Sequence, residues 1–249
     1  MKKLAFILIP SLIMLFACQP KQEPAKTETV PAAANQSETI VINEEKPVPG
    51  AGLKDVKPPS DNTKNVSTLM HRGEELIKSK NYEEAIEYLN RAMELQPQNP
   101  RILFYRGMAY FSLKDYDKAL ADFNKSLIIN PVDTEALLNS GLAKYFKNDL
   151  KGALQDYSKA ISYSNRFSKA YYNRGLVRGL FKDYQGAVDD FTQAIIFDPT
   201  YPEAYYNRGL ANFYKNDTMN ACFDWMQANR MGSPNAQKAI GLYCEKWNH

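Results

Sequence analysis

A spacing of 34 residues recurs through the chain from residue 73 onward, and it constrains the fold more than any other feature. Five glycines keep this spacing, and so do five alanines that each stand twelve residues after a glycine. Four residues beyond each alanine stands a large apolar residue. Such a period predicts supersecondary units that stack, because each unit alone leaves an apolar face exposed. The columns are Gly73, Gly107, Gly141, Gly175 and Gly209; Ala85, Ala119, Ala153, Ala187 and Ala221; and Leu89, Phe123, Tyr157, Phe191 and Trp225.

These columns, with a proline closing three of the units, resemble the tetratricopeptide repeat (TPR). The resemblance implies an all-α fold, a right-handed superhelical solenoid of five TPR helix hairpins plus a C-terminal capping helix. We expect a lipoprotein signal peptide over residues 1–17, a proline-rich tether over 18–63, the repeats over 64–235 and the capping helix over 236–249. The five units are 66–99, 100–133, 134–167, 168–201 and 202–235.

The columns also predict how each hairpin is held. Glycine on the first helix and alanine on the second are expected where the helices cross closely, since a larger side chain would push them apart. A short polar residue between the helices can cap the free N–H groups of the second helix. These residues are Asn81, Asp115, Asp149, Asp183 and Asp217.

The family's usual apolar residue before the glycine is arginine in four units and Ser140 in the third. In three units an aspartate follows sixteen residues later, which predicts an ion pair between the two helices. The alternative is a solvated pair that contributes about 0–1 kcal/mol. We interpret the pair as structural, because a feature repeated along the array is not how an active site is built. The residues are Arg72, Arg106, Arg174 and Arg208, with Asp122, Asp190 and Asp224, and with Tyr88 in the first unit.

The N-terminus predicts export. Lys2 and Lys3 precede an apolar stretch over residues 4–15, which is shorter than the roughly 20 residues that cross a bilayer as a helix. The run Leu15-Phe16-Ala17-Cys18 resembles a bacterial lipobox, which implies cleavage before Cys18 and its acylation. A simple secretory signal is the alternative. Gln19 after the cysteine resembles outer-membrane lipoproteins, so we expect a lipid anchor in the outer membrane, facing the periplasm, as the chain's only contact with the membrane.

Residues 19–63 contain seven prolines and no Trp, Tyr or Phe. Such a segment buries too little apolar surface to offset its ordering entropy, so we expect a tether. Two alternatives are a proline-rich ligand and a segment, 40–60, that folds back into the groove of the repeats.

Cys222 and Cys244 each lie eleven residues from Ser233, the centre of the last turn. Positions equidistant from the turn of a helix hairpin are level, so a disulfide is feasible if both side chains face the seam. An exported protein meets an oxidising compartment, which permits it. Two buried free thiols are the alternative.

The family resemblance implies that the first helices line a concave groove for a partner. Aromatic rings there would take the partner's side chains, and amides would bind its backbone. The alternative for this surface is inter-helix core, which we favour for Leu142, Leu176 and Leu210. The candidate groove residues are Phe104, Tyr105, Phe111, Asn139, Tyr145, Tyr172, Asn173, Tyr206, Asn207, Phe213 and Tyr214.

Composition argues against several other functions. The formal charge of +3 gives no support to nucleic-acid binding. Two histidines are a poor inventory for acid–base chemistry, and no hydrolase motif occurs. We therefore expect a non-enzymatic scaffold for an envelope protein or peptide, without cofactor, metal or nucleic acid. The alternatives are a surface-displayed receptor and an envelope hydrolase.

Overall fold

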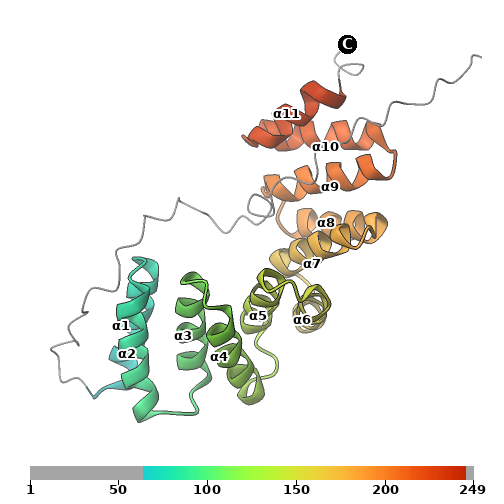
Figure 1. Cartoon of the computed structure of the whole chain (residues 1–249). Helices are drawn as coiled ribbons and strands as arrows, with labels where there is room; N and C mark the ends of the chain where they lie inside the picture. The colour runs from blue at the N-terminus through green and yellow to red at the C-terminus, as the bar shows by residue number, and fades with distance from the viewer. Residues whose placement is uncertain (1–63, 245–249) are drawn as a thin grey trace, which may run out of the picture. The chain divides into compact units, whose positions relative to one another are not determined.

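The computed structural model describes residues 64–244, and every regular element among them is an α-helix (Figure 1). The all-α repeat fold expected from the sequence is confirmed. Each of the five units holds one pair of helices, and α11 follows them. The helices are α1 (Val66–Lys78), α2 (Tyr82–Leu95), α3 (Pro100–Ser112), α4 (Tyr116–Ile129), α5 (Thr134–Phe146), α6 (Leu150–Tyr163), α7 (Ser168–Leu180), α8 (Tyr184–Phe197), α9 (Pro202–Tyr214), α10 (Thr218–Arg230) and α11 (Pro234–Tyr243).

The helices pack in chain order, each against the one before and the one after it (Figure 1). The odd-numbered helices also contact one another, α1 with α3 and so on to α9. The even-numbered helices of the described segment make no comparable contacts. The odd-numbered helices therefore form the inner layer of the stack, as the family resemblance implied for the first helix of each unit.

A left-handed residue ends the first helix of every unit, a feature that the sequence columns did not reveal. The five residues have φ between 62° and 64°. One residue later, the aspartates of units two to five each accept a hydrogen bond from a backbone N–H in the first turn of the second helix. The cap expected at Asn81 is wrong, because its side chain makes no such bond. The left-handed residues are Lys80, Lys114, Asn148, Lys182 and Asn216.

The glycine column makes room for the large residue sixteen positions later in the same unit. A Cβ added to Gly141 would lie 2.5 Å from Cε1 of Tyr157, and one on Gly209 would lie 2.6 Å from Nε1 of Trp225. The large residues are at most 2% exposed in all five units. Burying one such side chain contributes roughly 1.5–3 kcal/mol, so this column supplies much of the core. The close approach is between the glycine and this large side chain, whereas the sequence led us to expect glycine opposite alanine.

The last helix differs from its expected bounds. It begins at Pro234, two residues earlier than predicted, because Ser233 caps it through a hydrogen bond from the N–H of Ala236. Proline suits the first position, where no N–H is needed. The helix ends at Tyr243, and the rest of the predicted span, 245–249, lies outside the described residues. The predicted signal peptide, the lipobox and the tether also lie outside them.

Candidate functional site

Three of the predicted groove residues belong to the core. Tyr172 is 2% exposed, Asn173 8% and Asn207 6%. The Tyr172 ring packs 5.7 Å from Phe191 and 4.7 Å from Tyr201, and its hydroxyl accepts a hydrogen bond from Asn207. Their assignment to an open groove was wrong, because all three side chains are buried.

The asparagines predicted to bind a peptide backbone each donate an amide N–H to a carbonyl of their own helix, and Asn207 also donates to Tyr172. Asn139 donates to the carbonyl of Glu135, Asn173 to that of Lys169, and Asn207 to that of Glu203. This bond to the carbonyl four residues earlier is a common fate of short polar side chains on helices. The amides therefore stabilise the inner helices.

The remaining candidates lie at two places along the inner layer. On α3, Phe104, Met108 and Phe111 share one face at helical spacing, and all are partly buried. Tyr105 and Tyr145 are also partly buried. We call Phe104, Tyr105, Met108, Phe111, Tyr145 and Phe146 the aromatic face.

Ring stacking holds the aromatic face together across two units. Phe111 lies 5.5 Å from Tyr116 and 5.7 Å from Phe146, in edge-on geometry. Tyr116 and Phe146 stack at 5.2 Å, with 4° between their planes. Tyr116, at the start of α4, was not among the predicted residues. The recurrence of tyrosine at positions 82, 116 and 184 was the signal that would have found it.

The polar edge of this face is formed by Tyr105. Its hydroxyl accepts a hydrogen bond from Arg101 at 3.3 Å. A hydrogen bond from Lys78 lowers the pKa of Glu74, and a hydrogen bond from Tyr105 lowers it further by a smaller amount. Glu74 is therefore a carboxylate, and it stands beside the rings. Burial raises the pKa of Tyr145, which therefore stays a neutral phenol that can donate a hydrogen bond.

The second group of candidates lies beside the capping helix. Tyr214 is 37% exposed and stacks on Tyr184 at 5.1 Å. The Phe213 ring lies 4.6 Å from that of Tyr243 on α11, so the cap covers part of it. Tyr206 is partly buried, and its carbonyl accepts a hydrogen bond from the indole of Trp225. Phe213 and Tyr206 therefore contact residues of the C-terminal cluster, Tyr243 and Trp225, and are less available to a partner than the aromatic face.

The predicted ion pairs form, and they are buried rather than solvated. Arg106, Arg174 and Arg208 each hold the aspartate of the next helix through two N–H groups at 2.7–3.0 Å. The aspartate side chains are 2–4% exposed. At Asp224, burial outweighs Arg208 and raises the pKa of the carboxyl above its usual value.

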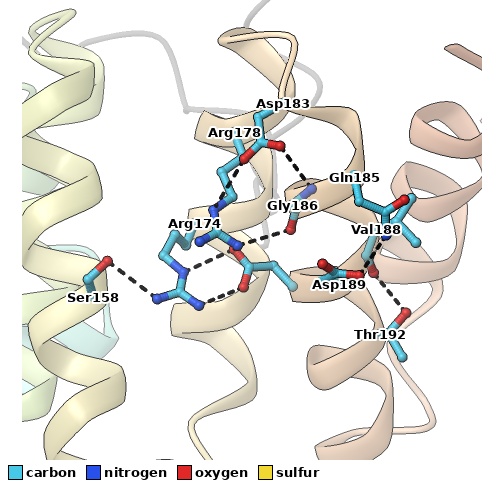
Figure 2. Close-up of polar contacts among 10 residues, drawn as sticks. Ser158, Arg174, Arg178, Asp183, Gln185, Gly186, Val188, Asp189 and Thr192 are labelled. Atoms are coloured by element: carbon cyan, nitrogen blue, oxygen red, sulfur yellow. Dashed lines mark hydrogen bonds and ion pairs between the residues drawn. The ribbon is translucent and has the colours of Figure 1, made fainter. Parts of the chain in front are cut away.

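Each of these arginines also reaches the second helix of the preceding unit. Figure 2 shows Arg174 of α7 donating to Ser158 of α6. Arg106 donates to Asn90, and Arg208 to Thr192, at the same offset of sixteen residues. One guanidinium thus joins three helices, a link to the preceding unit that the sequence reading missed. The repetition supports a structural role.

A disulfide joins Cys222 of α10 to Cys244, which caps α11, with the Cα atoms 5.7 Å apart. Both cysteines are 1% exposed, within the cluster that contains Trp225. The disulfide therefore links the capping helix to the last repeat.

The described segment contains neither a metal-binding cluster nor a membrane-spanning helix. No group of three or more His, Cys, Asp or Glu residues there could hold a metal ion. Within residues 64–244, no helix has the length and apolar character needed to cross a membrane.

Two segments of the chain match known repeat families. Residues 72–134 match the family described as Tetratricopeptide repeat, and residues 182–216 match the family described as TPR repeat. No curated protein has significant sequence similarity to the chain.

Solved structures share the fold. MamA from Desulfovibrio magneticus RS-1 is 21% identical over 67% of this chain and 94% of its own, with a TM-score of 0.61. PilF of Pseudomonas aeruginosa is 16% identical over 73% of this chain and 85% of its own, with a TM-score of 0.66. YrrB, described as a TPR protein with an unusual peptide-binding site, is 19% identical over 72% and 94%, with a TM-score of 0.60. The two matched segments are similar to tetratricopeptide repeats, and these solved structures show that the chain shares their fold.

Proposed function

We propose that this chain is a non-enzymatic interaction protein that binds a peptide or protein partner on the aromatic face. The observation that carries the proposal is the set of partly buried rings on α3 and α5, which are held in place by stacking and yet remain accessible. Rigid aromatic side chains give a large contact area at a low entropic cost, and they dominate binding at many protein interfaces.

The surroundings of the face favour an extended segment with a mixed sequence. Phe111 and Phe146 offer apolar contact, while Tyr145 offers a phenol beside them. The Glu74 carboxylate and the Arg101 guanidinium flank Tyr105. A segment that combines an apolar anchor with polar neighbours would match this arrangement. YrrB, which has the same fold, is described as having a peptide-binding site, and this supports peptide capture.

We further propose that the chain works from a lipid anchor at Cys18 in the outer membrane, facing the periplasm. The support is the lipobox-like run at residues 15–18, followed by the proline-rich segment 19–63. A tether of about 45 residues has a relaxed reach on the order of 35–40 Å, so the repeats can meet partners away from the lipid surface. Assembly of an envelope or secretion complex is the role that best fits an anchored interaction protein.

Capture of partners from envelope extracts tests the binding proposal. Full-length chains carrying Tyr105→Ala or Tyr145→Ala should recover about fivefold less partner, the loss expected for a residue that contributes roughly 1 kcal/mol. Phe223→Ala is the matched control, because Phe223 is 54% exposed on α10, outside the aromatic face. Equal recovery by the two tyrosine variants and the wild type would reject this face as the binding surface.

The anchor needs a separate test. Labelling cells with a radioactive fatty acid should mark the wild-type chain, and Cys18→Ala should abolish both the label and membrane retention. A Cys18→Ala chain that still carries the label would refute lipidation at this residue. Protease treatment of intact cells then distinguishes the two orientations, since a chain that faces the periplasm stays protected and a surface receptor is cut.

A further inference from the structure

The third unit lacks the arginine that joins three helices elsewhere in the stack. Ser140 occupies the position held by Arg106, Arg174 and Arg208 in other units. Figure 2 shows the complete arrangement in the fourth unit, where Arg174 reaches from α7 to Ser158 on α6. Its other N–H groups bind Asp190 at 2.7 and 3.0 Å.

The groups that would bind the missing arginine are still present. Asp156 stands at the position of Asp122 and Asp190, and it is 5% exposed. Asn124 stands at the position of Asn90, which accepts a hydrogen bond from Arg106. Ser140 and Lys144 both bind Oδ2 of Asp156, at 2.7 and 2.6 Å. Within residues 64–244, nothing donates a hydrogen bond to the other carboxylate oxygen, Oδ1, or to the side-chain oxygen of Asn124.

An open pocket lies beside Asp156 and Asn124. It has a volume of about 410 Å³ and lies between α4, α5 and α6. Asp156, Asn124 and Lys144 line it together with Leu127, Leu137 and Tyr163. Tyr163 is 53% exposed, so the pocket opens to solvent at the ends of the even-numbered helices.

We propose that this pocket binds the side chain of an arginine from a partner protein. The guanidinium donates to Oδ1 of Asp156 and to Asn124, as the chain's own arginines do in units two, four and five. Its methylene stem lies along Leu127, Leu137 and Tyr163. Arginine fits better than lysine, because a planar fork of donors can serve two acceptors at once. Residues 1–63 contain no arginine, so the tether cannot supply this side chain.

Lys144 and Lys159 both line the pocket, and these two cations do not exclude an arginine. In the fourth unit, Arg178 stands at the position of Lys144 and binds Asp190 at 2.9 Å, although Arg174 binds the same carboxylate. In the second unit, Lys125 stands at the position of Lys159, and Arg106 still binds Asp122 at 2.7 Å. The chain itself thus shows that one buried aspartate accepts a guanidinium with another cation beside it.

This inference rests on the proposed partner binding and deepens it, because it names a residue that a partner must present. The pocket is lined by residues other than those of the aromatic face, so the two proposals can fail separately. If Tyr145→Ala lowers recovery of a partner and Ser140→Arg does not, the aromatic face is supported and the pocket is rejected. If Ser140→Arg lowers recovery and Tyr145→Ala does not, the pocket is supported and the aromatic face is rejected.

Binding of a blocked peptide, acetyl-Gly-Arg-Gly-amide, to the full-length chain provides the test, measured by saturation-transfer NMR. The matched peptide carries citrulline, which has the same shape without the charge. We expect citrulline to bind about tenfold more weakly, the loss of one charge-assisted hydrogen bond. Ser140→Arg fills the pocket with the chain's own guanidinium and should abolish binding, while Ser140→Ala leaves the pocket open and should retain it.

Asn124→Leu provides a second variant, since Asn124 is exposed and its change leaves the fold intact. It should weaken binding of the arginine peptide about threefold, with little effect on the citrulline peptide. Circular dichroism of each variant shows whether the helices are retained. Equal binding of the two peptides, or full binding by a folded Ser140→Arg chain, would overturn the proposal.

Discussion

The buried ion pair of the fourth unit makes a prediction that depends on which partner is removed. Asp190 is 2% exposed and holds two guanidinium groups, those of Arg174 and Arg178. Asp190→Ala removes the counter-ion of Arg174 beside the seam between units and leaves Arg178 only its 3.8 Å contact with Asp183. Arg174→Ser instead reproduces the arrangement of the third unit, where Ser140 and Lys144 both donate to Oδ2 of Asp156.

The two substitutions should therefore differ in their effect on the free energy of unfolding. Removing one member of a buried pair costs about 3–5 kcal/mol, and we expect the lower end because Arg174 remains 16% exposed. For Arg174→Ser we expect about 1 kcal/mol, because Arg178 stays on Asp190 and the new hydroxyl replaces one donor. Asp189→Ala, on the exposed face of the same helix, should change stability by less than about 0.5 kcal/mol.

Urea denaturation followed by circular dichroism measures these differences. Amide hydrogen exchange in α7 and α8 supplies the local value, because repeat arrays can open in parts. If Arg174→Ser costs as much as Asp190→Ala, the third unit is not a valid template for a repeat without arginine. The third unit could then not be used to judge how well a carboxylate is stabilised next to the open pocket.

Three further predictions concern the glycine column, the cap and the turns. Gly141→Ala should destabilise the chain by about 1–3 kcal/mol because its Cβ would meet the Tyr157 ring, whereas Gly179→Ala, with nothing within 4 Å, should stabilise it by about 0.5–1 kcal/mol; thermal unfolding of both variants checks the sign. Reducing the Cys222–Cys244 disulfide, which spans 22 residues, should lower the free energy of unfolding by about 3 kcal/mol. Amide hydrogen exchange should then rise first in α11, and unchanged exchange in α11 after reduction would contradict this. Hydrogen bonds from the side chain and then the backbone of Asn220 lower the pKa of Asp217, so its stabilising effect is present above the unfolded pKa of about 4 and is lost as the pH falls through the folded value. Asp217→Asn should remove this part of the acid sensitivity, which urea midpoints measured from pH 5 to about pH 2 would show.

The repeat pattern predicted the scaffold well and the binding surface less well. The position of Gly141 in its column indicated a crowded site, and the ring of Tyr157 occupies it. Both Tyr172 and Tyr206 were assigned to a groove, yet Tyr172 is in the core while Tyr206 is only partly buried. These two residues stand 34 apart and hold the same position in the repeat, so only the neighbouring units distinguish them.

The sequence alone determined the all-α repeat architecture and the register of its helices, because spacing along the chain fixes which side chains share a helix face. It also indicated the Arg–Asp pairs, since both members recur at one offset. Tertiary structure decided their burial, the third helix that each arginine reaches, and the pocket beside Asp156 in the unit where Ser140 breaks the column. These features depend on the packing of one unit against the next, because the contacts that form them join residues of different units.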